Sequence, residues 1–306
     1  MNMVSQGAGV AQHAPAFATR EVGAKPIAPS ASRNMRVGLG DRGTSLSIRN
    51  VSMVFSRAGH SVHALDGIDL DIKEGQFIAV VGPSGCGKST LLKLVTGLRP
   101  PTAGTISILD KPVTGPRSDV GIVFQSPVLL PWRTVLQNVM LPIDILRLDQ
   151  AEYEKRAREL LHLVGLDGFE GAYPQELSGG MQQRAAIARA LVYDAPILMM
   201  DEPFGALDAM TRDQMNVEVQ RIWEASGKTV VFITHSIPEA VFLADRVVVM
   251  SPRPGRILKV LEIDLPRTRS LDDMLTPQFG EYVREIRGMF GSGNSARGKN
   301  DRKTNW

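Results

Sequence analysis

The decisive stretch of this sequence is Gly82-Pro83-Ser84-Gly85-Cys86-Gly87-Lys88-Ser89-Thr90. It reads G-x-x-x-x-G-K-[ST], the pattern of a phosphate-binding loop. Small residues let consecutive backbone N–H groups turn inward around an anion, and the helix that follows adds the positive end of its dipole. Lys88 can reach the outer phosphates, and the Ser89 hydroxyl is placed to bind Mg²⁺. We therefore expect all nine residues to bind a triphosphate.

The residues on either side of this loop support the same interpretation. Phe77–Val81 is an apolar, β-prone run, and Thr90–Val95 has the composition of a helix. The alternative, a glycine-rich turn that binds nothing, does not require this order of strand, loop and helix. Cys86 has no neighbouring base in the sequence, so we expect a small space-filling residue rather than a nucleophile.

The composition is that of a globular protein with a sizeable core. The chain has 306 residues, enough for one large or two modest domains, and its single cysteine excludes an internal disulfide. The net charge of +3 arises at the two ends: residues 1–45 hold five Lys or Arg against two Asp or Glu, and residues 284–306 hold six against two. The remaining core is slightly acidic, so no nucleic-acid partner is expected. No apolar run approaches the roughly 20 residues of a membrane span, and no signal-peptide segment is apparent.

Two kinds of strand are predicted, which indicates an α/β domain. Alternating polar and apolar residues predict strands at 45–51, 65–72 and 104–109, typical of an antiparallel layer, with a turn at 59–63. Continuous apolar runs predict buried strands at 77–81, 120–124, 196–201 and 229–234, and two late strands are expected at 247–250 and 256–260. Helical patterns separate the apolar strands, so the core sheet should be mainly parallel. The helix after Asp208 has a core-facing stripe of Met215, Val219, Ile222 and Trp223.

The remaining segments define the expected domain organisation. Residues 126–148 contain three prolines, and a helical pattern follows at 150–163, so residues 126–176 look like a helical insertion beside the sheet. With the helix that runs from 178 to about 192, they form an expected helical subdomain over about 126–195, within a domain over 45–270. Residues 1–44 are rich in Ala, Gly, Ser and Pro and are expected to be disordered, with a transit peptide as the alternative. Residues 271–306 form a C-terminal extension that we expect to be polar and frayed from 292.

Two carboxylates follow the predicted strand at 196–201. Asp201 at the end of this buried strand can hold Mg²⁺ opposite the phosphate loop, and Glu202 can polarise an attacking water. A pair of exposed carboxylates at a strand end is the alternative, and the phosphate loop upstream makes it the weaker one.

The most specific motif is Leu177-Ser178-Gly179-Gly180-Met181-Gln182. Ser178 and two glycines at the start of a helix form a second anion site, whereas a plain helix cap would need neither glycine. An L-S-G-G-x-Q helix start between a phosphate loop and the D-E-P carboxylates resembles the ATP-binding cassette (ABC) superfamily. The resemblance covers roughly residues 45–265.

The resemblance implies a P-loop NTPase fold of the cassette type and a set of site residues. Ser178, Gly179, Gly180 and Gln182 would bind nucleotide, and Phe55 matches the aromatic residue that stacks on adenine. Gln125 matches the glutamine that touches Mg²⁺ and the attacking water, and Gly205–Asp208 matches the loop at the dimer seam. His235 matches the switch histidine near the γ-phosphate, although Ser236 stands where an Asp is usual. Catalysis would then rest on Glu202, His235, Lys88 and Gln125, and the metal on Ser89, Gln125 and Asp201.

Further stretches look like the cassettes that power uptake of nitrate, aliphatic sulfonates and taurine. They are Leu130-Pro131-Trp132, the run D-E-P-F-G-A-L-D over 201–208, and Pro252-Arg253-Pro254-Gly255-Arg256-Ile257. The resemblance implies an ATPase that uses ATP and Mg²⁺ as a homodimer at the cytoplasmic face of the inner membrane. It would bind membrane permease subunits, which receive their solute from a substrate-binding protein. Trp132 would either contact the permease or fill the core of the cassette.

Other functions of a cassette remain as alternatives. One is a soluble ATPase of DNA repair or translation, although the coiled-coil or zinc insertions usual there are not found. Another is the cassette of an exporter or of a lipoprotein-release system. A third is a nucleotide-binding regulator that does not hydrolyse ATP. The hydrolysis residues are all present, which weighs against this alternative: Lys88, Asp201, Glu202 and His235.

Overall fold

The computed structural model describes residues 43–57, 60–205 and 207–291, which belong to one unit of the chain. The expected fraying from 292 lies outside the described residues, as does almost all of the expected disorder over 1–44.

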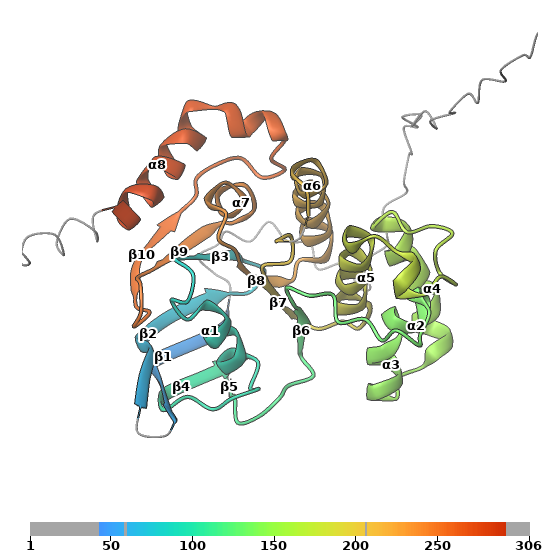
Figure 1. Cartoon of the computed structure of the whole chain (residues 1–306), viewed down its shortest axis with the longest axis horizontal. Coiled ribbons are helices and arrows are strands. Elements are labelled where there is room, and N and C mark those ends of the chain that lie inside the picture. The colour runs from blue at the N-terminus through green and yellow to red at the C-terminus, as the bar shows by residue number, and fades with distance from the viewer. Residues whose placement is uncertain (1–42, 58–59, 206, 292–306) are drawn as a thin grey trace, which may run out of the picture. The chain divides into compact units, whose positions relative to one another are not determined.

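A six-stranded sheet forms the centre of this unit (Figure 1). Its strand order is β10-β9-β3-β8-β7-β6. The strands are β3 Phe77–Val81, β6 Val120–Val123, β7 Ile197–Asp201, β8 Thr229–Ile233, β9 Arg246–Met250 and β10 Ile257–Glu262. All neighbours from β9 to β6 are parallel, and β10 pairs antiparallel with β9 at the edge. The mainly parallel core sheet is thereby confirmed.

A second sheet of four antiparallel strands is also confirmed. Its order is β2-β1-β4-β5, with β1 Thr44–Arg57, β2 His60–Lys73, β4 Ala103–Ile108 and β5 Lys111–Pro112. The expected turn at 59–63 is wrong, because His60 and His63 lie within β2 and pair with Arg57 and Val54 of β1. The two strands therefore extend further toward their connection than the alternating pattern indicates.

The core lies on both faces of the six-stranded sheet, since successive side chains of a strand point to opposite faces. Ile78 and Val80 of β3 pack with the antiparallel sheet and with helix α1 (Lys88–Val95). Phe77, Ala79 and Val81 pack on the other face with helices α6 (Ala209–Ser226) and α7 (Ile237–Leu243). The predicted stripe of α6 is buried there.

The predicted helical insertion forms a group of helices beside the sheet (Figure 1). It comprises α2 Val135–Val139, α3 Leu141–Leu146, α4 Gln150–Leu163, the 3₁₀ turn η2 Pro174–Glu176, and α5 Gly179–Val192. Polar residues set the helix starts: Thr134 and Gln137 form a capping box before α2, and Asp149 caps α4 through the N–H groups of Ala151 and Glu152. Helix α5 contacts α2, α3 and α4, and its buried alanines allow this close approach.

The C-terminal part contains a helix that was not among the elements expected from the sequence. After the 3₁₀ turn η3 (Leu271–Leu275), helix α8 (Pro277–Gly291) packs on α7 and buries Phe279 and Ile286. The expected domain boundary at residue 270 stays a prediction. None of the helices in the described ranges has the length and apolarity needed to cross a membrane.

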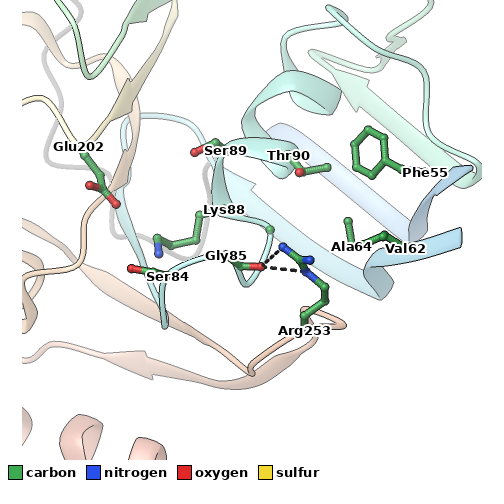
Figure 2. A pocket seen from close by; sticks show the side chains of 11 residues that line it. Phe55, Val62, Ala64, Ser84, Gly85, Lys88, Ser89, Thr90, Glu202 and Arg253 are labelled. Atoms are coloured by element: carbon green, nitrogen blue, oxygen red, sulfur yellow. Dashed lines mark hydrogen bonds between the residues drawn. The ribbon is translucent and has the colours of Figure 1, made fainter. Parts of the chain in front are cut away.

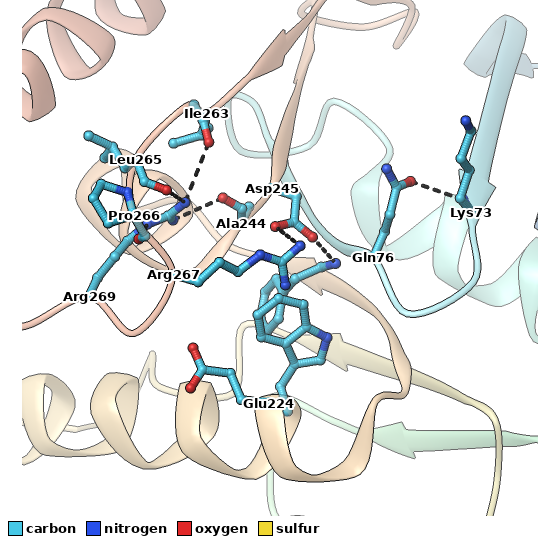
Figure 3. A network of polar contacts seen from close by, with 12 residues as sticks. Lys73, Gln76, Glu224, Ala244, Asp245, Ile263, Leu265, Pro266, Arg267 and Arg269 are labelled. Atoms are coloured by element: carbon cyan, nitrogen blue, oxygen red, sulfur yellow. Dashed lines mark hydrogen bonds and ion pairs between the residues drawn. The ribbon is translucent and has the colours of Figure 1, made fainter. Parts of the chain in front are cut away.

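Two arginines, the buried Arg269 and the exposed Arg267, hold the segment before α8 in place (Figure 3). Arg269 donates to the carbonyl oxygens of Val241, Phe242 and Ala244 at 2.8–2.9 Å, which satisfies backbone acceptors at the C-terminal end of α7. Arg267 pairs with Asp245 at 2.6 Å, and the same carboxylate accepts a hydrogen bond from the N–H of Phe77. The segment is thus fastened to the first residue of β3.

Candidate nucleotide-binding site

The phosphate loop connects β3 to α1, in the order that its motif requires. Two of its glycines have left-handed backbone, Gly85 with φ 75° and Gly87 with φ 108°. A Cβ on Gly87 would lie 2.6 Å from Leu65 Cδ2 and 2.9 Å from the carbonyl oxygen of Ala64. Lys88 Nζ donates to the carbonyl oxygens of Gly82 (2.8 Å) and Pro83 (3.2 Å), so its ammonium group is held across the loop.

The side chain of Cys86, within the loop, is buried, as expected for a space-filling residue. Its thiol lies 2.8 Å from where a Cβ of Gly82 would be, so Gly82 leaves the room that the sulfur takes. Burial raises the pKa of the Cys86 thiol, and the Lys88 ammonium opposes this shift only in part. A neutral, buried thiol is a poor nucleophile.

A pocket of about 250 Å³ opens above the loop (Figure 2). Its walls come from five parts of the chain: Phe55 of β1, Val62 and Ala64 of β2, the loop residues Ser84, Gly85 and Gly87 to Thr90, Glu202 after β7, and Arg253 between β9 and β10. Phe55 lies at one end and Lys88 toward the other, which suits a ligand with an aromatic base and a charged tail. The Arg99 guanidinium stands 5.1 Å from the centre of the Phe55 ring.

The strand-end carboxylate faces the loop hydroxyl. Ser89 Oγ donates to Asp201 Oδ1 at 3.3 Å. Burial raises the pKa of Asp201, which the Ser89 hydrogen bond opposes and the Glu202 charge assists. No group of three or more His, Cys, Asp or Glu side chains is placed to hold a metal ion in the described part of the chain. Such a sparse set of oxygen ligands fits Mg²⁺, which usually keeps waters and phosphate oxygens as its other ligands.

Two polar side chains from neighbouring strand ends meet the Glu202 carboxylate. Gln125, after β6, donates through Nε2 to Glu202 Oε2 at 3.5 Å, and His235 Nδ1, after β8, lies 3.2 Å from the same oxygen. Because β8, β7 and β6 are parallel neighbours, their carboxyl ends share one edge of the sheet. Glu202 itself has φ 45°, a left-handed backbone that is unfavourable for a residue with a Cβ.

Buried polar contacts connect His235 to the loop before α6. Thr234 Oγ1 donates to Glu239 Oε2 at 2.6 Å and accepts from the Ser236 N–H at 3.0 Å. Arg212 of α6 lies 3.5 Å from Glu239 and donates to the carbonyl oxygen of Leu207 at 2.9 Å. Ser236, which replaces the usual Asp, caps α7 by accepting from the N–H of Glu239. The serine at position 236 therefore still supplies a capping group for α7, although an Asp is usual there.

The glycine-rich start of α5 lies outside this pocket. Ser178 caps the helix, and no residue from 177 to 184 is among the described residues that line the pocket. Gln182 donates to the carbonyl oxygens of Pro174 (2.8 Å) and Leu177 (3.3 Å), so its amide holds the preceding turn. Within one chain the structure therefore does not bring Ser178, Gly179, Gly180 and Gln182 to the phosphate loop.

Helix α5 also holds the segment that follows Gln125. Gln183 donates to the carbonyl oxygen of Phe124 at 3.1 Å, and Arg189 donates to those of Pro127 and Val128 at 2.8 and 2.7 Å. Sequence reasoning identified neither residue as functional. It also used Arg253 only as a mark of resemblance, although its motif between β9 and β10 was a signal that this loop is specialised.

A phosphate loop facing strand-end carboxylates across one edge of a parallel sheet defines a P-loop nucleotide hydrolase. The match to the ABC transporter family covers residues 65–205. The chain is 48% identical to the taurine import ATP-binding protein TauB of Rhizobium johnstonii, over 81% of this chain and 97% of that protein. It is 45% identical to the aliphatic sulfonates import ATP-binding protein SsuB of Bacillus cereus, over 74% and 89% of the two chains.

Solved structures agree with the sequence comparison. The dimeric structure of the bacterial ABC transporter cassette MJ0796 superposes with a TM-score of 0.65 at 35% identity, covering 72% of this chain and all of that one. A dimeric post-hydrolysis state of the same cassette, with ADP and phosphate bound, gives a TM-score of 0.64. The chain therefore belongs to the ABC transporter family, and it is an ATP-binding cassette ATPase.

Proposed function

We propose that this chain is the ATP-hydrolysing subunit of a membrane importer for a small sulfonate or a related small anion. Its relatives named for taurine and aliphatic sulfonate import, matched over 89–97% of their length, support this class of solute. In this proposal two copies bind ATP head to tail at the cytoplasmic face of the inner membrane, below permease subunits that receive solute from a binding protein.

Each site residue has a chemical role in this proposal. Phe55 stacks on adenine, the residues from Gly82 to Thr90 bind the phosphates, and Lys88 neutralises their outer charge. Glu202 orients the attacking water, while Gln125 and His235 fix the carboxylate through their contacts with its Oε2 atom. Ser178, Gly179, Gly180 and Gln182 complete the site of the other copy.

Mg²⁺ fits the oxygen atoms beside the loop. Ser89 and Asp201 would hold it, with Gln125 as a further ligand, and it would neutralise phosphate charge during hydrolysis. The chain's own residues then place the water and bind the phosphates.

The observation that carries the coupling to a permease is the exposure of Trp132. This side chain is 70% exposed in the segment that begins at Gln125. Buried Asn138 fixes the segment, because its amide accepts from the Leu130 N–H at 2.7 Å and donates to the carbonyl oxygens of Leu130, Arg133 and Thr134 at 3.0–3.1 Å. Large exposed apolar groups held rigidly mark binding surfaces. The exposure favours a permease contact over a place in the cassette's own core.

Trp132→Ala tests this assignment. We expect the free energy of unfolding of the isolated subunit to change by no more than about 0.5 kcal/mol, since an exposed side chain is removed. Basal ATP hydrolysis should persist, while solute uptake and stimulation by the permease should be lost. Thermal denaturation, ATPase assays and uptake of radiolabelled taurine in a complemented deletion strain measure these quantities.

The matched control is Trp223→Ala. Trp223 is 5% exposed and packs edge-on against Phe77, so its truncation should destabilise the subunit by about 3–5 kcal/mol. A comparable loss of stability in Trp132→Ala would contradict the docking assignment. Normal solute uptake by Trp132→Ala would contradict the docking assignment as well.

A further inference from the structure

The loop between β9 and β10 forms part of the floor of the nucleotide pocket. Residues 251–256 fold back so that the Gly255 N–H donates to the carbonyl oxygen of Ala64 and the Gly255 carbonyl accepts from the Asp66 N–H, at 2.9 and 3.0 Å. A Cβ on Gly255 would lie 2.1 Å from the carbonyl oxygen of Cys86. Only glycine therefore permits this approach, which presses the loop against both β2 and the phosphate loop.

Arg253 extends from this loop to the phosphate loop (Figure 2). Its Nε and Nη2 atoms both donate to the carbonyl oxygen of Gly85, at 3.2 and 3.0 Å. Gly85 has left-handed backbone at the tip of the loop, and the guanidinium occupies the space beside it. The contact joins residues 168 positions apart and holds the tip from outside.

The charge of Arg253 is not neutralised by the protein. Within the described ranges, no carboxylate lies within ion-pair distance of its guanidinium, whereas Arg256 of the same loop is paired with Asp66. Arg253 lines the pocket together with Lys88 and Phe55. Two of its five N–H groups donate to the carbonyl oxygen of Gly85. An unpaired cation beside a phosphate loop attracts a polyanion.

We propose that Arg253 is a nucleotide-positioning residue, which fixes the tip of the phosphate loop and adds a positive charge for the phosphates. This inference rests on the proposed binding of ATP in this pocket and extends it to a residue of the β9–β10 loop. Arg253 is on the opposite side of the pocket from Glu202, so it strengthens binding without taking part in the orientation of water.

Arg253→Gln in the full chain tests the proposal. We expect the dissociation constants of ATP, ADP and inorganic tripolyphosphate, and the KM for ATP, each to rise by about tenfold at low salt, as for the loss of one charge-assisted contact. The kcat should stay unchanged. Arg253→Lys should keep most of the affinity, and added salt should reduce the difference between wild type and Arg253→Gln.

The matched control is Arg256→Gln, which removes the neighbouring arginine but leaves the pocket lining unchanged; its affinity for ATP should equal that of wild type. Equal losses in both variants would show that loop stability, not the Arg253 charge, matters, and would overturn the proposal. So would wild-type affinity in Arg253→Gln, an equal loss in Arg253→Lys, a loss confined to kcat, or weakened ATP binding with normal tripolyphosphate binding. Failure of the wild-type chain to bind ATP would instead overturn the proposed function.

Discussion

At the scale of single residues, the site combines strain with convergent hydrogen bonding. Glu202 adopts a left-handed backbone conformation, and its N–H is held by the carbonyl oxygen of Ile233 at 2.8 Å. A non-glycine residue in this region costs roughly 1–3 kcal/mol, which the surrounding sheet must offset. The strain turns the carboxylate toward Gln125 and His235, away from the direction that a continuing strand would give it.

Glu202→Gln should separate nucleotide binding from turnover. The amide has the same shape but cannot accept a proton from water, so we expect ATP hydrolysis to fall by about a hundredfold or more while ATP affinity stays near that of wild type. Steady-state ATPase assays and ATP titration measure the two effects. Hydrolysis close to the wild-type rate would remove Glu202 from its proposed role.

At the scale of elements, the strands that carry the site at their carboxyl ends are joined to each other by polar contacts at their opposite ends. Lys228, just before β8, is buried and donates to Asp194 at 2.8 Å and to the carbonyl oxygen of Ala195 at 2.6 Å. These contacts join the start of β8 to the turn between α5 and β7. The hydrogen bond from Lys228 lowers the pKa of Asp194, and burial lowers the pKa of Lys228.

The shift at Asp194 predicts a pH-dependent contribution to stability. Since the folded state lowers this carboxyl's pKa, the stabilisation is present above the unfolded-state pKa and is lost as the pH falls through the folded-state pKa. Asp194→Asn should therefore reduce the free energy of unfolding by about 1 kcal/mol at neutral pH, a value discounted for the exposure of the carboxylate. The difference between wild type and variant should vanish in strong acid, as measured by urea denaturation across the pH range.

Asp167→Asn provides the control for this measurement. Asp167 contacts His162 on α4, and both side chains are 60% exposed, so its loss should change stability little. A difference between wild type and Asp194→Asn that persists unchanged at acid pH would show that the ion pair is not its source.

At the scale of the whole molecule, the two predicted anion-binding motifs lie apart within one chain. The phosphate loop faces its own carboxylates, whereas Ser178 and its glycines lie outside the pocket. Position 179 has open space where a Cβ would be, as a surface that receives another molecule requires. The related cassette MJ0796 is dimeric in both of its structures compared with this chain.

Ser178→Arg should therefore block assembly without blocking binding by the single chain. In the Glu202→Gln background, ATP should produce a dimer on size-exclusion chromatography, and the added Ser178→Arg change should abolish it because the arginine fills the second anion site. ATP affinity of the monomer should persist, since no residue from 177 to 184 is among the described pocket lining.

Asp149→Ala, which removes the cap of helix α4, controls for the loss of helix capping and should leave the dimer intact. Loss of ATP binding by the Ser178→Arg monomer would place Ser178 in its own chain's site, and a persisting dimer would exclude it from the interface.

The sequence by itself determined most of the local elements and the class of the protein. The strand before the phosphate loop, helix α4 over 150–163 and helix α5 up to Val192 were predicted from short-range patterns, because hydrophobic periodicity and capping residues act within a few positions. The ABC cassette fold and the ATPase class followed from the resemblance of three motifs to that family: the phosphate loop, the L-S-G-G-x-Q helix start and the D-E-P carboxylates. Helix α8 was missed although Phe279, Tyr282, Val283 and Ile286 recur at helical spacing, because residues 271–306 were expected to form a polar extension.

Only the tertiary structure decided which of these residues meet. Gln125 and His235 contact Glu202 because β6, β7 and β8 are neighbours in the sheet. No single segment of the sequence specifies this strand order. Arg253 reaches Gly85 because β9 lies next to β3, although the two strands are far apart in the chain. The exposure of Trp132 likewise depends on how Asn138 fixes the preceding turn. Such contacts depend on sheet order and on packing across long sequence separations, which residue patterns in a single segment do not specify.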